Sequence, residues 1–299
     1  MKNKKGVSLI VLVITIIVMI ILAAVIILSL SNSGIISKAN KAKTDNDVSN
    51  AKELVEVAHS EWLLMTADEQ TENGGSFVNY ATDKLEKSGY DPDKYILSEE
   101  GGMEVCVAKI GDVKYASLQD AIDSAKENVK TVINLTYNIN LSNTITIDTE
   151  KDIVIDMFGY SITNNTGNAI SNSGILTLKD TSSSKSGSIV AVSDKSKYVS
   201  KYDINGDGVV GQKDIDKILE NYNTTINGDT SEDVKKCDLN DDKIINLDDI
   251  TLIINHYNDG YAVLNNGKDS ILNIKDINKN NLKGEPEAIY NKEGSVVEN

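Results

Sequence analysis

The sequence contains no arginine and only two histidines and two cysteines, so it is poor in the residues that most often do chemistry. His59 and His256 fall in separate helical patterns, and neither indicates a general base. Cys106 and Cys237 lie in different parts of the chain, and we expect two buried free thiols. The net charge of −15 argues against nucleic-acid binding, because that needs a basic surface.

Two acidic loops of twelve residues are the strongest positive signal. They cover residues 203–214 and 238–249, and apolar residues at helical spacing follow each one. Oxygen-bearing side chains stand at loop positions 1, 3, 5 and 12, and position 7 offers a main-chain carbonyl, a pattern that wraps calcium. The expected ligands of two calcium ions are Asp203, Asn205, Asp207, Val209 and Asp214 in the first loop, and Asp238, Asn240, Asp242, Ile244, Asn246 and Asp249 in the second.

The duplicated loop-then-helix unit has Asp at position 12, and residues 197–202 are too short and polar for a helix entering the first loop. In these respects residues 202–259 resemble a type I dockerin. The resemblance implies an all-α calcium-binding module of two loop–helix repeats that docks into a cohesin domain of another protein. A calcium-stabilised module without a partner is the alternative. The resemblance places the cohesin contacts at positions 10 and 11 of each loop, which are Gln212, Lys213, Leu247 and Asp248.

Two residues depart from the dockerin pattern. Lys243 replaces the glycine of position 6, and we expect it to weaken the second calcium site through backbone strain and a nearby positive charge. Gly211 supplies no side chain at position 9 of the first loop, so we expect water there. The residues at positions 10 and 11 also differ between the loops, which argues against two symmetry-related docking modes.

The N-terminus predicts a membrane anchor. Lys2, Lys4 and Lys5 precede an apolar run over residues 7–30, which as a helix is long enough to cross a bilayer. Lysines on the short side favour a cytoplasmic N-terminus and an extracellular remainder. The sequence therefore predicts a single-pass membrane protein.

The first residues also resemble a type IV prepilin leader, with the resemblance covering residues 1–65. It implies cleavage after Gly6, with Val7 as the new N-terminus, and a helix that continues past the membrane. Val11 stands where fibre-forming pilins carry Glu, which favours a minor pilin or a pilin-derived anchor over a major fibre subunit. An anchor that is never cut is the alternative.

Beyond the membrane, residues 46–64 repeat apolar side chains at helical spacing and extend the pilin-like helix to about residue 66. Residues 67–103 show little periodicity and are expected to form a connector or a small head. From residue 104 short β-branched runs alternate with turns rich in Asn, Gly, Ser and Asp, after a short helical pattern at residues 117–125. The expected strands cover residues 105–110, 132–135, 144–147, 153–157, 175–178 and 189–192.

This order of one short helix and many short strands resembles the start of a right-handed parallel β-helix of the pectate-lyase-like class. Such segments occur in surface proteins of low-GC Gram-positive bacteria. A repeated motif agrees with stacked coils, because residues 169–174 are echoed at 262–267 and 288–294. In successive coils the asparagines of this motif would stack as a ladder: Asn172, Asn265 and Asn291. The motif occurs on both sides of the dockerin-like region, which is therefore expected to be inserted.

The expected architecture is multidomain, with a transmembrane pilin-like helix, a short β-helix and an inserted dockerin. In chain order we expect a leader (1–6), a membrane and amphipathic helix (7–66), a connector or head (67–103), a first β-helix segment (104–201), the dockerin (202–259) and a second, truncated β-helix segment (260–299).

We expect a non-enzymatic protein of the bacterial cell surface or pilus that binds a cohesin-bearing partner. One alternative is a minor pilin or adhesin, in contact with pilin subunits or glycans, whose β-helix binds the glycan. A second is a surface-anchored polysaccharide lyase or glycoside hydrolase, which the absence of arginine disfavours.

Overall fold

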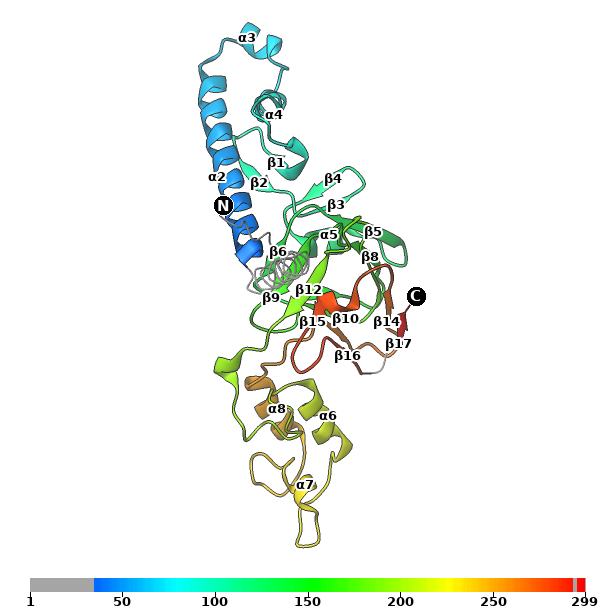
Figure 1. The fold of residues 1–299 in the computed structure, drawn as a ribbon. Helices are drawn as coiled ribbons and strands as arrows, with labels where there is room; N and C mark the ends of the chain where they lie inside the picture. Colours follow the sequence, from blue (N-terminus) through cyan, green and yellow to red (C-terminus); the bar gives the residue numbers. More distant parts are fainter. Residues whose placement is uncertain (1–34, 293–294, 299) are drawn as a thin grey trace, which may run out of the picture. The chain divides into compact units, whose positions relative to one another are not determined.

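The computed structural model describes residues 35–292 and 295–298 (Figure 1). The predicted membrane run at residues 7–30, with Gly6 and Val7, lies outside the described residues. Within the described ranges no helix is long and apolar enough to cross a bilayer. The chain divides into two compact units. One comprises the residues up to Pro92 together with Leu97–Met103, and the other comprises Asp93–Ile96 and the residues from Glu104 onward.

The first unit is helical. Its helices are α2 (Ile35–Leu64), α3 (Ala67–Glu72) and α4 (Phe77–Lys87). The helix expected at residues 46–64 is confirmed as part of α2, and its Val55 and Ala58 are buried. α4 lies inside the expected connector and buries Phe77 and Leu85, with Ser76 capping its first turn. The chain continues through η1 (Pro92–Lys94) and a two-stranded sheet of β1 (Tyr95–Leu97) and β2 (Met103–Val105).

The second unit is rich in parallel strands that visit three sheets in turn, and each pass through the sheets is one coil. After the antiparallel pair β3 (Ala108–Ile110) and β4 (Val113–Tyr115), helix α5 (Leu118–Ser124) leads into the parallel strands. The strands are β5 (Lys130–Leu135), β6 (Ile139–Leu141), β7 (Ile145–Ile147), β8 (Asp152–Asp156), β9 (Ser161–Asn164), β10 (Ile170–Asn172), β11 (Ile175–Lys179), β12 (Ser188–Ala191), β13 (Val263–Asn265), β14 (Ile271–Ile274), β15 (Leu282–Lys283), β16 (Ile289–Asn291) and β17 (Ser295–Glu298).

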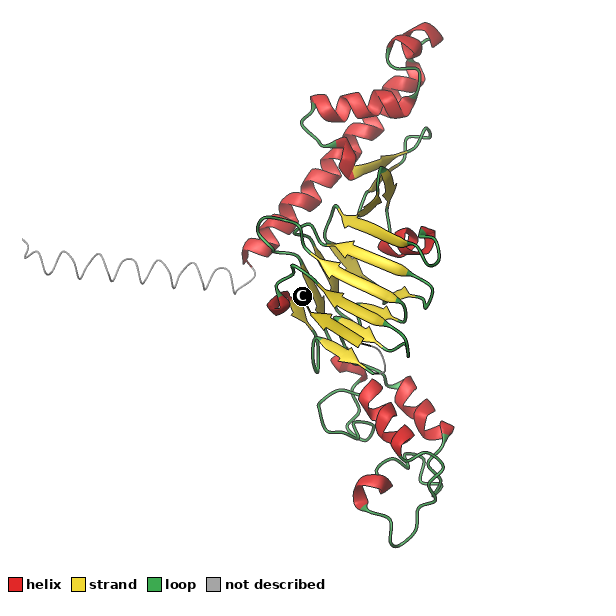
Figure 2. Ribbon diagram, turned by 90° about the vertical axis from the view of Figure 1, so that its right-hand side faces the viewer, coloured by secondary structure: helices red, strands yellow, loops and turns green. Residues whose placement is uncertain are grey.

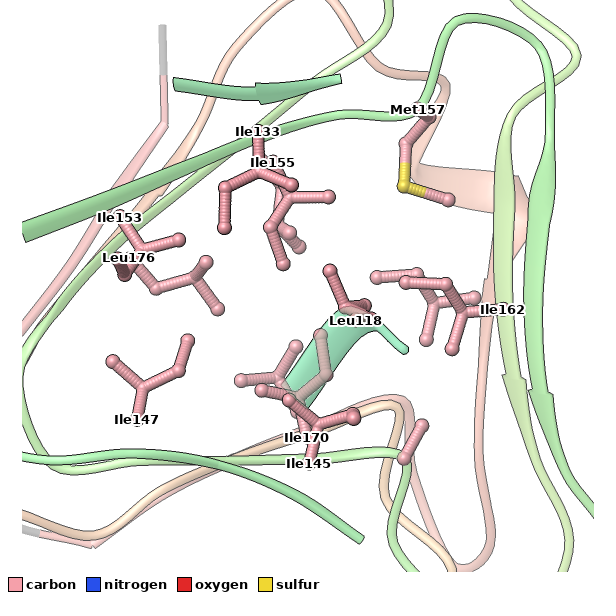
Figure 3. Packing of buried hydrophobic residues seen from close by; sticks show 14 of the residues in the cluster. Leu118, Ile133, Ile145, Ile147, Ile153, Ile155, Met157, Ile162, Ile170 and Leu176 are labelled. Carbon is pink, nitrogen blue, oxygen red and sulfur yellow. The ribbon is translucent and has the colours of Figure 1, made fainter. Parts of the chain in front are cut away.

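The coils stack in register. The three sheets have the orders β16-β13-β10-β7, β17-β14-β11-β8-β5-β3-β4 and β15-β12-β9-β6, so corresponding strands of successive coils are neighbours (Figure 2). Inward-facing Ile, Leu and Val side chains from all three sheets form one core, which Leu118 of α5 joins (Figure 3). Two of the strands, β6 and β9, come from Asn-rich stretches where no strand was expected. The strands that the sequence predicted are confirmed, although residues 106 and 107 interrupt the first of them, predicted at residues 105–110.

The asparagine ladder is also confirmed. Asn172 pairs with Asn265 in the parallel register, and Asn265 pairs with Asn291. Asn172 Nδ2 donates to Asn265 Oδ1 (2.7 Å), and Asn265 Nδ2 donates to Asn291 Oδ1 (2.6 Å). The chain therefore leaves the sheets after β12 and returns at β13, the next strand of the same coil, without a change of register.

Between β12 and β13 lies the loop–helix segment, residues 193–259. It contains η2 (Lys195–Lys197), α6 (Gln212–Glu220), α7 (Glu232–Lys235) and α8 (Leu247–Asn255); a last short helix, η3 (Lys279–Asn281), follows β14. α6 and α8 lie side by side in both views (Figures 1 and 2). The loop–helix segment has a hydrophobic core of its own, which comprises Val210, Ile215, Ile218, Cys237, Leu239, Ile245, Ile250 and Ile253. Cys237 and Cys106 are buried free thiols, as expected.

Candidate metal centre

In the first acidic loop, main-chain N–H groups donate hydrogen bonds to the side-chain oxygens of the expected ligands. Asp203 at position 1 accepts from the N–H groups of positions 4 and 6 (2.8 and 3.0 Å). Asn205 at position 3 accepts from position 5 (2.8 Å), and Asp207 at position 5 accepts from position 7 (3.2 Å). Asp214 at position 12 accepts from positions 2, 3 and 9 (2.7, 3.1 and 2.8 Å). These bonds leave each carboxylate with further lone pairs for a cation.

The second loop repeats this arrangement almost position for position. Asp238 accepts from positions 5 and 6 (3.1 and 3.0 Å), Asn240 from position 5 (3.0 Å) and Asp242 from position 7 (2.8 Å). Asp249 accepts from positions 2, 3 and 9 (2.7, 3.3 and 2.9 Å). Two segments 35 residues apart thus fold into the same turn around the same oxygen-bearing positions.

The backbone of both loops turns through the left-handed region at positions 4 and 6. In the first loop these positions are Gly206 and Gly208, with φ of 78° and 89°. In the second they are Asp241 and Lys243, with φ of 62° and 72°. Glycine adopts this region freely, whereas a residue with a Cβ is strained there. The strain expected at Lys243 is therefore present.

Position 12 of each loop is a fully buried carboxylate at the start of a helix, Asp214 for α6 and Asp249 for α8. Burial raises the pKa of Asp214 to about 6, with a smaller contribution from Asp203, although hydrogen bonds from three main-chain N–H groups act in the opposite direction. A buried carboxylate beside other acids is costly without a compensating positive charge. The donor set therefore fits a hard cation that prefers oxygen ligands, such as calcium.

Within the described residues, no three or more His, Cys, Asp and Glu side chains converge closely enough to form a metal-binding group. In the expected calcium pattern, Asn205 and Asn240 and the carbonyls of Val209 and Ile244 contribute alongside the carboxylates. Val209 is buried, Ile244 is exposed, and Asn246 at position 9 accepts from Asp248 N–H (2.7 Å) at the start of α8. The calcium ligand set remains a prediction.

The four residues expected to contact a cohesin lie in two different surroundings. Lys213 forms an ion pair with Glu287 between β15 and β16 (2.8 Å), and Gln212 Nε2 donates to Asp216 (3.0 Å). In contrast, the Leu247 side chain is 61% exposed, and Asp248 is exposed beside it. The structure therefore separates a first-repeat pair engaged within the chain from a second-repeat pair open to solvent.

Asp216 shows how closely α6 is held to the last coil. It accepts a hydrogen bond from the Tyr290 hydroxyl and lies 3.2 Å from Lys292 Nζ, and both residues belong to the stretch around β16. Burial raises the pKa of Tyr290 above its ordinary range, and the hydrogen bond to Asp216 acts in the same direction. No sequence pattern indicated these contacts, because they join residues more than seventy positions apart.

The sequence reasoning also missed Asn258, which fastens the two ends of the loop–helix segment. Its Oδ1 accepts from Val210 N–H (2.6 Å), and its N–H donates to the Val210 carbonyl (2.7 Å). Its carbonyl accepts from Asp194 N–H (3.1 Å), so residues near both ends of the segment meet here.

Comparison of the chain with models of protein families, with curated proteins and with solved structures finds no match.

Proposed function

We propose that the loop–helix segment is a type I dockerin that binds two calcium ions and docks into a cohesin domain of a partner protein. The observation that carries this proposal is the shared geometry of the two loops. Position 12 accepts from the same three loop positions in each, and the backbone is left-handed at the same two positions. Metal binding would order both helices, because the loops position the first turns of α6 and α8.

The rest of the chain is proposed to carry this module on a bacterial surface. The three-sheet stack of coils supports a short right-handed parallel β-helix, into which the dockerin is inserted. The apolar run at residues 7–30 supports a single-pass anchor with a cytoplasmic N-terminus, and the residues around Gly6 and Val7 support a prepilin-like leader. The proposed protein is not an enzyme. The coils carry several acids, and one of them, Asp156, is buried and engaged by Thr181 and Lys179.

The docking face is proposed to belong to the second repeat. Leu247 is exposed, as are Ile244 before it (46%) and Ile254 two turns further along α8 (56%). The first repeat also exposes Leu219 and Tyr222, but its Val209, which corresponds to Ile244, is buried. Lys213 of the first repeat is instead paired with Glu287. This difference at positions 10 and 11 supports a docking orientation that uses the second repeat over the one that uses the first.

The test is binding of the full-length chain, held in a mild detergent, to a panel of type I cohesin domains. Binding should require calcium, should be lost with a chelator, and should weaken about tenfold in Leu247→Ala, because an anchor side chain at an interface contributes on this scale. Lys213→Ala is the matched control and should change the affinity little. Calcium uptake without binding to any cohesin would reduce the segment to a calcium-stabilised module, and equal losses in both variants would refute the one-sided docking face.

A second candidate function is glycan binding by the coils. A cavity of about 460 Å³ lies beside β6 and is lined by Tyr137, Asn138, Asn140 and Asn143, among others. Aromatic rings and amide side chains are suited to stacking on sugars and hydrogen bonding to them. Retention of the chain on immobilised polysaccharides, lowered by Asn140→Ala and unchanged by Leu247→Ala, would support an adhesin instead.

A further inference from the structure

The first loop lacks a side chain at position 9, and a residue from outside the loop occupies its space. A Cβ built on Gly211 would stand 2.6 Å from Asp259 Cγ and overlap the Asp259 carboxylate. Asp259 lies beyond the end of α8, 48 positions further along the chain. Its Oδ2 accepts from the main-chain N–H of Gln212 (3.1 Å), the first residue of α6. Asp259 thus accepts from the first turn of α6 at loop position 10, and Asn246 at position 9 of the second loop accepts from the first turn of α8 at position 11, the N–H of Asp248.

The internal repeat shows where the two loops differ. With the offset of 35 residues, Gly211 corresponds to Asn246, and Asp259 corresponds to Thr224. The main chain around these residues is equivalent, because Asn258 N–H donates to position 8 of the first loop and Asn223 N–H donates to position 8 of the second (2.7 and 2.8 Å). The second loop therefore has a side-chain oxygen at position 9, on Asn246. At position 9 of the first loop, the carboxylate of Asp259 occupies the space next to Gly211.

The Asp259 carboxylate is buried and only partly satisfied. The residue is 1% exposed, and its Oδ1 has no donor at hydrogen-bonding geometry among the described residues. Asp207, at position 5 of the same loop, acts on this carboxylate electrostatically, more weakly than the nearby side chains of Tyr257 and Asn168 do. A buried carboxylate oxygen without a donor is costly unless a cation or an ordered water meets it.

We propose that Asp259 supplies the missing position-9 oxygen of the first calcium site, to the metal or to a water bound on it. This inference rests on the proposed calcium-binding function. It replaces the expectation that water alone fills the position next to Gly211. Position 9 commonly reaches calcium through water, and an outer ligand of this kind contributes about tenfold or more to metal affinity.

The proposal makes the first site depend on how the segment is closed. Asp259 follows Asn258, whose side chain and main chain hold Val210 of the first loop and Asp194 at the segment's start. Gly260 comes next, and there is no room for a side chain there, because a Cβ would overlap the main chain of Val192 and Ser193. Calcium in the first loop would therefore bind more tightly when the chain's exit from the segment is in place.

The experiment removes the carboxylate at position 259 and then restores one at position 211. Calcium is titrated by calorimetry into the full-length chain in detergent, with the second loop silenced by Asp242→Ala so that one site is measured. Asp259→Thr, which copies Thr224 of the other repeat, should weaken binding about tenfold. The double variant Gly211→Asp/Asp259→Thr puts the same charge at position 9 within the loop and vacates the space it needs, so it should recover most of that loss. Asp180→Asn, a buried acid on the coils, is the control.

The outcomes separate this inference from the proposed function. An unchanged calcium affinity in Asp259→Thr, or a double variant as weak as the single one, would overturn the role of Asp259 while leaving calcium binding intact. If Asp259→Thr fails to fold, as judged by circular dichroism in chelator, Asp259→Asn keeps the size and one acceptor oxygen, and it should still lose affinity. A parent chain that takes up no calcium at all would overturn both proposals.

Discussion

Lys243→Gly is predicted to stabilise the second acidic loop. Lys243 has φ of 72° at position 6, where the first loop has Gly208 with φ of 89°. The left-handed conformation costs a residue with a Cβ about 1–2 kcal/mol. Glycine loses more conformational freedom on folding, which offsets about 0.5–1 kcal/mol. The net gain in unfolding free energy is therefore about 0.5–1 kcal/mol.

This gain should be visible without metal, because it arises from the backbone. For a unit of this size it corresponds to a rise in melting temperature of about 1–4 °C, measured by circular dichroism in chelator. With calcium present the rise should be larger, because the variant also removes a positive charge close to the site. We expect calcium affinity at the second loop to increase roughly threefold at low salt, and less at high salt.

Lys236→Gly is the matched control, because Lys236 has an ordinary right-handed backbone with φ of −62°. There the same substitution should lower stability by about 0.5–1 kcal/mol. Asp241→Gly relieves the strain at position 4, but it also removes an acid, so it should not raise calcium affinity. A Lys243→Gly chain that melts no higher than the parent in chelator would refute the strain argument.

Two further predictions concern the coils. Asn265→Ala should lower the unfolding free energy by about 1–3 kcal/mol in denaturant titrations, because it breaks the two ladder hydrogen bonds to Asn172 and Asn291, whereas Asn266→Ala next to it should cost well under half of that. Asn172 Nδ2 keeps the carbonyls of Gly174 and Ile271 as acceptors, which limits the loss. Burial would raise the pKa of Asp156, but hydrogen bonds from Thr181 and the contact with Lys179 outweigh it and lower the pKa below 3.8. Because the folded pKa is the lower one, the parent's stability advantage over Asp156→Asn should be full at pH 7, should begin to shrink as the pH falls below about 4, and should be lost below the folded pKa. An advantage that grows as the pH falls below about 4 would contradict the assignment.

Much of the coil architecture could be read from local sequence. The strands around Val154, Leu176 and Ile189 are β-branched or leucine-rich runs bounded by turn residues, and the repeated motif with Asn172, Asn265 and Asn291 indicated which coils stack. Strands β6 and β9 were not predicted, because each is only three or four residues long and lies among asparagines. Helix α4 carried a signal that was overlooked: Ser76 as a cap, followed by Phe77, Tyr80, Ala81 and Leu85 at helical spacing.

The candidate site was predictable only as far as its ligands are contiguous. Both acidic loops are visible in sequence because turn geometry fixes their spacing over twelve residues. Asp259 and the ion pair of Lys213 with Glu287 are not, because they join residues 48 and 74 positions apart through folding. Comparing Gly211 with Asn246 and Thr224 with Asp259 across the repeat is the sequence signal that could have identified Asp259.

The junction at Asn258 also determines how mechanical force would travel through the chain. The loop–helix segment enters from β12 and leaves to β13, which are consecutive strands of one coil and lie in two different sheets. A pull applied to the segment through a bound partner would reach two sheets of this coil at once, with the Asn258 hydrogen bonds to Val210 and Asp194 bearing it first. This coil has neighbours on both sides, because β12 lies between β9 and β15 and β13 lies between β10 and β16. The load would therefore be shared by several parallel ladders instead of opening one strand at a time from the end of the stack.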